Sequence, residues 1–196
     1  MLLALGISII SNSSFYILAY IPTYGEKTLH LPASTGFTAT LIGGAILAIG
    51  CPLAGHWSDK ISRPLLMVIA CWLFVMTSYL SFWLMATWPS LLACVIAVAW
   101  LQLVKAGYSG VLPSLLSEQF PVEVRAIGVS FGFSTAVSIF GGLAPLVATW
   151  LIAQTGDPLS PSYYLIFTAL LSLIALIAIQ WQRRRATRLV PVSLTA

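Results

Sequence analysis

Six apolar runs dominate the sequence, and each is close to the roughly 20 residues that a helix needs to cross a bilayer. They cover residues 2–22, 36–55, 64–86, 90–113, 127–153 and 162–181. In lipid only helices and closed barrels satisfy all their backbone polar groups, and barrel strands are about half this long and alternate in polarity. The runs therefore predict an all-α membrane protein with six transmembrane helices.

Composition excludes a water-soluble domain. Charged residues make up 7% of the chain and hydrophobic residues 59%, whereas soluble domains carry roughly 25% charged residues. Four of the nine bases follow the last apolar run in the segment RRRATR, which is typical of a membrane stop and not of a nucleic-acid site. We predict a transmembrane bundle over residues 1–182, in contact with the lipid bilayer, and a basic cytoplasmic tail over 183–196.

Lysines and arginines predict the orientation, because cytoplasmic loops carry an excess of them. The even-numbered connections and the C-terminal segment contain Lys60, Arg63, Arg125 and the four tail arginines, whereas the opposite side has only Lys27. Both termini are therefore expected in the cytoplasm. Within the fifth run, Gly141, Gly142 and Pro145 favour a bend.

The cysteines indicate no chemistry. Cys51, Cys71 and Cys94 all lie inside apolar runs, and their spacing matches no metal site or disulfide framework. We interpret them as small buried hydrophobic residues, and we predict neither a metal site nor a cofactor.

The stretch GHWSDKISRP, residues 55–64, gathers three charges between two apolar runs. It resembles the loop signature of the major facilitator superfamily, which joins the second and third helices of a six-helix half on the cytoplasmic face. The matching residues are Gly55, Ser58, Asp59, Lys60 and Arg63. Ser62 and Pro64 depart from the signature, which has a glycine and a base at those positions.

A second resemblance covers residues 117–152, which are similar to the C-terminal half of metabolite–proton symporters for citrate, α-ketoglutarate, shikimate or proline and betaine. The residues that carry it are Glu118, Phe120, Pro121, Arg125, Gly128 and 139–142. Residues 22–34 also resemble the first external loop of this half. The resemblance implies one half of a major facilitator fold, no enzymatic activity, and proton-coupled symport of a small organic solute across a bacterial-type inner membrane.

The charged connections are candidates for a latch on the inner face, which the resemblance implies for the outward-open state. Charges near helix ends pair more strongly than in bulk water because the effective dielectric is lower. Anchoring by positive charge is the alternative, and it accounts for the bases but not for the acid at position 59. The candidate latch residues are Asp59, Lys60, Arg63, Glu118 and Arg125.

One base lies deep within the fourth run. A lysine at the centre of a membrane costs about 2.5–3.5 kcal/mol on insertion scales, and no acid lies within a run to neutralise Lys105. A cation without a protein partner suits an anionic substrate such as citrate or a related carboxylate, although Lys105 could instead snorkel or pair with another helix. Steps of three and four residues predict one polar face with it. Its members are Gln102, Lys105, Tyr108 and Ser109.

The first run has a polar stripe of its own, because Asn12, Tyr16 and Tyr20 recur at steps of four. In the family, the first and fourth helices of each half line the central cavity. The resemblance therefore implies that both stripes line a substrate path. A packing role for the two tyrosines is the alternative.

Two other interpretations remain open. The segment 107–110, GYSG, in a chain of six runs resembles an intramembrane serine protease, but nucleophilic catalysis needs a base beside the serine, and both histidines lie in predicted loops. In addition, facilitators have two six-helix halves with the site between them. The chain is then expected to pair with an N-terminal half or a second copy, or to be a truncated transporter without function.

Overall fold

The computed structural model describes the backbone of residues 1–58, 60 and 62–189, and the side chains of these residues up to 182. Most of its described residues are helical, and the six predicted spans are confirmed. Three single helices come first: α1 (Leu2–Lys27), α2 (Ala33–Ser58) and α3 (Arg63–Thr87). The fourth span joins α4 (Leu91–Ser109) to α5 (Leu112–Ser117). The fifth joins η1 (Val122–Val124), α6 (Arg125–Ala136), η2 (Val137–Gly141) and α7 (Ala144–Thr155), and the sixth is α8 (Ser160–Leu189).

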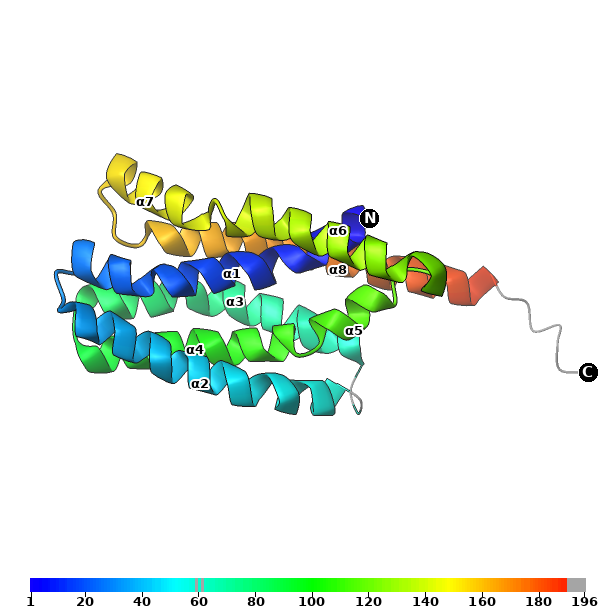
Figure 1. Ribbon diagram of the computed structural model, residues 1–196, viewed down its shortest axis with the longest axis horizontal. Coiled ribbons are helices and arrows are strands. Elements are labelled where there is room, and N and C mark those ends of the chain that lie inside the picture. Colours follow the sequence, from blue (N-terminus) through cyan, green and yellow to red (C-terminus); the bar gives the residue numbers. More distant parts are fainter. Residues whose placement is uncertain (59, 61, 190–196) are drawn as a thin grey trace, which may run out of the picture.

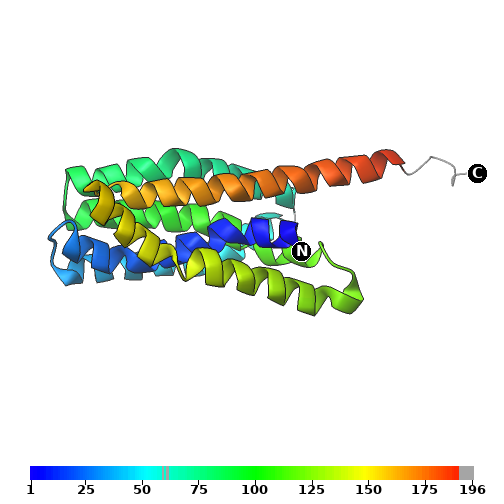
Figure 2. The same ribbon diagram turned by 90° about the horizontal axis from the view of Figure 1, so that it is seen from above.

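The helices form one elongated bundle in which α1 is the most buried span and α2 the least. Packed around α1 are α2, α8 and the α6–α7 segment, while α3 lies between α4 and α8 (Figures 1 and 2). The N-terminus, the end of α2, the start of α3, the 118–124 connection and the end of α8 lie at one end of the bundle (Figure 1). The other three connections lie at the opposite end. This alternation is the one expected of six consecutive crossings.

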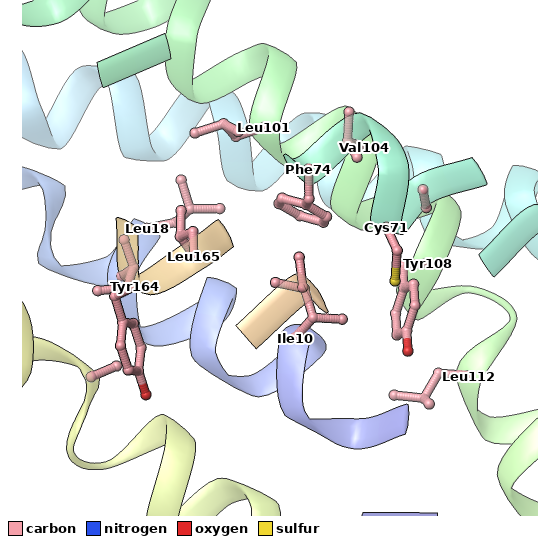
Figure 3. Packing of buried hydrophobic residues seen from close by; sticks show 14 of the residues in the cluster. Ile10, Leu18, Cys71, Phe74, Leu101, Val104, Tyr108, Leu112, Tyr164 and Leu165 are labelled. Carbon is pink, nitrogen blue, oxygen red and sulfur yellow. The ribbon is translucent and has the colours of Figure 1, made fainter. Parts of the chain in front are cut away.

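The core is built from large apolar side chains between helices, with small residues where two backbones meet (Figure 3). Gly6 of α1 faces Ala175 of α8 so closely that a Cβ on Gly6 would lie 2.6 Å from that of Ala175. Beside this contact, the Ser172 hydroxyl donates to the Gly6 carbonyl at 2.8 Å and accepts from the Ile10 amide at 3.0 Å. Close backbone approach and interhelical hydrogen bonds are what associate helices in lipid, where apolar burial gives no drive.

Two predicted boundaries are wrong. Pro22 was expected to close the first span, but it lies inside α1, which continues to Lys27. The fourth run was expected to end at residue 113, yet α5 carries it to Ser117 after an interruption at residues 110 and 111. The helix α8 also continues to Leu189, into the segment 183–196 for which a cytoplasmic tail stays a prediction. Propensity is a weak guide at these points because packing against neighbouring helices decides where a helix ends.

The bend predicted in the fifth span is present. A turn of π-helix, η2, separates α6 from α7, and the Gly142 amide donates to the Val137 carbonyl at 2.7 Å. The Tyr164 hydroxyl of α8 donates to the Phe140 carbonyl at 2.6 Å. A π-turn leaves carbonyls without their usual partners, and π-turns occur often at functional sites. This turn places Gly141 directly against α1.

Candidate functional site

Lys105 is a buried cation at the contact between α4 and α1. Its side chain is 3% exposed, and its Nζ lies 4.3 Å from the centre of the Phe15 ring. Over the described residues, that Nζ has no hydrogen-bond partner. A cation over an aromatic face is stabilised by the ring quadrupole, by about 0.5–2 kcal/mol, which is less than several hydrogen bonds would supply. The Lys105 ammonium is therefore left with capacity for an anion.

Gln102 lies one turn before Lys105 on α4 and is 6% exposed. Its Oε1 is also buried without a hydrogen-bond partner among the described residues. The stem of Gln102 is held from the other side by α2, because a Cβ on Gly43 would lie 2.9 Å from the Gln102 Cγ. Buried polar atoms are nearly always satisfied, so two orphans on adjacent turns mark this part of α4 as a site for a ligand or for water.

The helix α1 supplies the rest of this group. The hydroxyls of Ser11 and Ser109 are hydrogen-bonded to each other, with 3.0 Å between the oxygens. Phe15, one turn after Ser11, is 53% exposed and covers Lys105 from the surface of the bundle. These polar contacts define the α1–α4 seam, which we use below for Ser11, Phe15, Gln102, Lys105 and Ser109.

The predicted stripe on α1 lies on a different face from this seam. Asn12 donates through Nδ2 to the Ser8 carbonyl at 2.9 Å, within its own helix. The ring of Tyr16 packs where a Cβ on Gly141 would be, at 2.8 Å. The hydroxyl of Tyr20 accepts from the Thr149 hydroxyl at 3.1 Å. All three predicted residues thus lie toward η2 and α7, and the structure does not bring them together with Lys105.

Tyr108 does not share the face of Gln102 and Lys105. It is fully buried, and its hydroxyl donates to the Ile7 carbonyl at 2.6 Å, in the core beside Cys71 and Leu112 (Figure 3). Three residues advance an α-helix by about 300°, so a residue three positions further on lies about 60° around the helix axis from the first. Tyr108 lies two such steps after Gln102, and it is therefore on another side of α4. Ser109, seven residues after Gln102, returns to the polar side.

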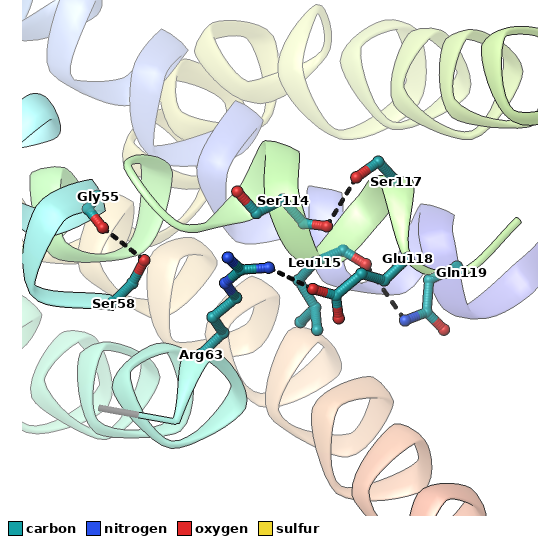
Figure 4. Close-up of polar contacts among 8 residues, drawn as sticks. All are labelled: Gly55, Ser58, Arg63, Ser114, Leu115, Ser117, Glu118 and Gln119. Carbon is teal, nitrogen blue, oxygen red and sulfur yellow. Dashed lines mark hydrogen bonds and ion pairs between the residues drawn. The ribbon is translucent and has the colours of Figure 1, made fainter. Parts of the chain in front are cut away.

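The charged connections form an ion pair at one end of the bundle. Arg63, the first residue of α3, pairs through its guanidinium with the carboxylate of Glu118, which follows α5 (Figure 4). Their side chains are 36% and 34% exposed, and exposed pairs contribute about 0–1 kcal/mol. The pair joins the third span to the fourth. Both of its residues are among the latch candidates predicted from the sequence.

The other predicted latch residues are less informative. Lys60 is exposed in the turn between α2 and α3, and Arg125 is exposed at the start of α6. Asp59, the acid on which the latch prediction depends, lies outside the described residues. Among the predicted latch residues that the structure describes, Arg63 and Glu118 form an ion pair, and the latch itself stays a prediction.

The arrangement around Ser109 does not resemble a serine nucleophile with its base. The recorded partner of the Ser109 hydroxyl is Ser11, another hydroxyl. Lys105 is one turn away, but its Nζ makes no hydrogen bond. The two histidines lie elsewhere, His30 in the connection after α1 and His56 in the last turn of α2.

Sequence reasoning missed the contribution of Phe15 and Thr149. Phe15 follows Ser11 by four residues, so its place on the same face as that serine was available from helical spacing. Nothing in the sequence indicated that Thr149 would meet Tyr20, because that contact depends on the course of the fifth span after its π-turn.

Comparison with known proteins places these features in a family. The model of the family described as Major Facilitator Superfamily matches residues 1–193. A citrate-proton symporter of Klebsiella pneumoniae is 33% identical over 166 residues, which are 84% of this chain and 37% of that protein. A protein of Staphylococcus aureus (strain N315) named for proline/betaine transport is 37% identical over 156 residues, 78% of this chain and 33% of that protein.

A third relative, an ectoine/proline transporter of Corynebacterium glutamicum, is 27% identical over 178 residues, which are 89% of this chain and 35% of that protein. The chain therefore spans little more than a third of the length of these curated relatives. With a family match over nearly its whole length and six helices that can cross a membrane, this chain belongs to the major facilitator superfamily of membrane transporters.

Proposed function

We propose that the chain acts in proton-coupled symport of a small solute that bears a carboxylate, and that Lys105 contacts this carboxylate. The observation that carries the proposal is the buried ammonium of Lys105, which lacks a hydrogen-bond partner over the described residues. A buried charge is costly unless it is paired, and intramembrane ionisable residues mark substrate paths. An anionic group on the solute supplies the missing partner.

The relatives support the substrate class but not one substrate. Citrate, proline, betaine and ectoine, the solutes in their names, all carry a carboxylate. They differ in the rest of the molecule, since citrate is an anion with three carboxylates and the others are zwitterions. In this proposal Lys105 binds the carboxylate that all four solutes share. Proton coupling is proposed from the printed name of the citrate relatives.

Transport by this chain is proposed to require a second six-helix bundle, either an N-terminal half or another copy. Phe15, which covers Lys105, is 53% exposed on α1, so the α1–α4 seam lies close to the surface of this bundle. Transporters of this kind hold the solute between two bundles that rock about it. One bundle then supplies one wall of the site.

Reconstitution tests this proposal. We expect liposomes that contain the chain together with a six-helix N-terminal half to accumulate labelled citrate or proline when a proton gradient is imposed. The chain alone is expected to insert without such uptake. Accumulation by the chain alone would show that a second copy supplies the other wall. Failure of both preparations to accumulate any of the four solutes would contradict the proposed function.

We also propose that both termini face the cytoplasm of a bacterial-type inner membrane. The support is the distribution of bases, because Lys60, Arg63 and Arg125 belong to the end of the bundle where the N-terminus and the end of α8 lie, and Lys27 to the other (Figure 1). Reporter fusions after residues 60 and 188 should both give a cytoplasmic signal. A periplasmic signal from either fusion would overturn the orientation.

A further inference from the structure

A groove on the outside of the bundle, between α2 and α3, is not used by the proposed transport mechanism. Both helices pack against α4, and over the described residues they make few contacts with each other. The space between them has a volume of about 430 Å³, and its lining is almost wholly apolar. Its walls include Leu53 and Trp57 of α2 and Ile69 and Leu73 of α3.

Small residues such as Ala54, Ala70 and Gly107 leave room in the lining of the groove, beside larger ones such as Trp100 and Leu103. Gly107 of α4 lies at the floor, and a Cβ built on it would meet no atom within 4 Å. Gly50 of α2 also lines the groove but is closely covered, because a Cβ on it would lie 2.7 Å from the Ala106 Cβ. The open space above Gly107 is therefore unfilled by this chain's own side chains.

We propose that this groove holds an acyl chain of an anionic phospholipid. The groove lies within spans that cross the membrane, so the molecules that reach it are lipids. Apolar cavities stay dry and accept apolar ligands.

The end of the groove supplies the reason for an anionic headgroup. Trp57 lines the groove near the end of α2, and its carbonyl accepts from the Lys60 amide at 3.0 Å. Lys60 is exposed in that turn, and His56 is exposed one residue before Trp57. A tryptophan at the membrane interface with an adjacent lysine is suited to a phospholipid, because the ring lies at headgroup level and the ammonium attracts phosphate.

The groove can be tested with lipid retention as the readout, independent of transport. The purified 196-residue chain is exchanged into mixed micelles that contain phosphatidylglycerol or phosphatidylcholine, and bound lipid is counted by native mass spectrometry. We expect the parent to retain phosphatidylglycerol in preference to phosphatidylcholine. Gly107→Leu, which fills the floor, should lose most of the retained lipid.

Gly44→Leu is the matched control, because a Cβ at Gly44 also meets no atom within 4 Å and this glycine does not line the groove. It should retain lipid as the parent does. Unchanged retention by a folded Gly107→Leu chain, or equal loss in both variants, would overturn the proposal.

The headgroup is tested separately. Lys60→Gln should lower the preference for phosphatidylglycerol about fivefold, which corresponds to the contribution of one basic residue near a membrane surface. Lys27→Gln removes an exposed cation at the opposite end of the bundle and should leave the preference unchanged. An equal effect of the two substitutions, or no preference in the parent, would contradict an anionic headgroup at the Lys60 end.

Discussion

The helix α4 meets α2 and α1 in opposite ways. Against α2 it packs through glycines: a Cβ on Gly43 would lie 2.8 Å from Val98, and one on Gly50 would lie 2.7 Å from Ala106. Against α1 it is held by a hydroxyl pair and by the Lys105 cation over a ring. The Lys105 Nζ there has no hydrogen-bond partner among the described residues, and neither has the Gln102 Oε1 one turn away, on a side chain whose stem packs on Gly43 of α2. We call the first contact the α2–α4 seam.

The difference separates a structural contact from a functional one. Close backbone packing is lost when a side chain is added, so the α2–α4 seam has one good arrangement. The α1–α4 seam retains unpaired polar groups that destabilise the protein unless a ligand binds, because a buried unsatisfied polar group costs about 1–3 kcal/mol. Natural proteins keep such groups where function requires them.

The largest expected effect is at the α2–α4 seam. Gly50→Leu should lower the free energy of unfolding by roughly 2–3 kcal/mol, because the Ala106 Cβ that it meets cannot move without its backbone. Thermal unfolding in detergent measures the change. Gly44→Leu, on the same helix with open space around it, should unfold like the parent. If both variants lost similar free energy of unfolding, close packing at the α2–α4 seam would not be the cause.

At the α1–α4 seam a substitution should raise the free energy of unfolding instead of lowering it. Lys105→Met keeps the length of the side chain and removes an unpaired charge, so it should raise the free energy of unfolding by about 1–2 kcal/mol. The same unfolding experiment checks it. A loss of stability would mean that Lys105 is already paired in the folded chain, and the comparison between the two seams would fail.

The ion pair between Arg63 and Glu118, at the end of the fourth span, should have the smallest effect on stability. In a double-mutant cycle, Arg63→Gln and Glu118→Gln should couple by less than about 1 kcal/mol in unfolding, as exposed pairs do. Their combined effect should be larger on transport by the complete assembly, if the pair holds one state of the transporter. Additive effects on uptake would leave positive-charge anchoring as the explanation for these residues.

Much of the fold was predictable from the sequence because lipid imposes one requirement on every span. The apolar runs predicted six helices, and Gly141, Gly142 and Pro145 indicated the break in the fifth. Helix ends were less predictable, as at Pro22, because a proline ends a helix only when neighbouring contacts do not stabilise its continuation.

The candidate site was predictable only in part. Burial of Lys105 followed from its position inside an apolar run, and the sequence places no acid within any of the predicted runs. The separation of Asn12, Tyr16 and Tyr20 from Lys105 did not follow, because two stripes on neighbouring helices face each other only if both helices have the right rotation. The rotation of α1 about its axis depends on packing against α7 and α8. The polar pattern within one helix does not determine that rotation.

Binding of a carboxylate solute tests the central claim most directly. The dissociation constant for citrate or proline is measured by titration calorimetry for the chain assembled with a six-helix half, and for its Lys105→Met, Lys105→Arg and Lys27→Met variants. Lys105→Met should bind at least about tenfold more weakly, since a hydrogen bond to a charged group contributes about 1.5–3 kcal/mol and 1.4 kcal/mol is tenfold. Lys105→Arg should lose less, and Lys27→Met should bind like the parent. Parent-like affinity in Lys105→Met would contradict the account.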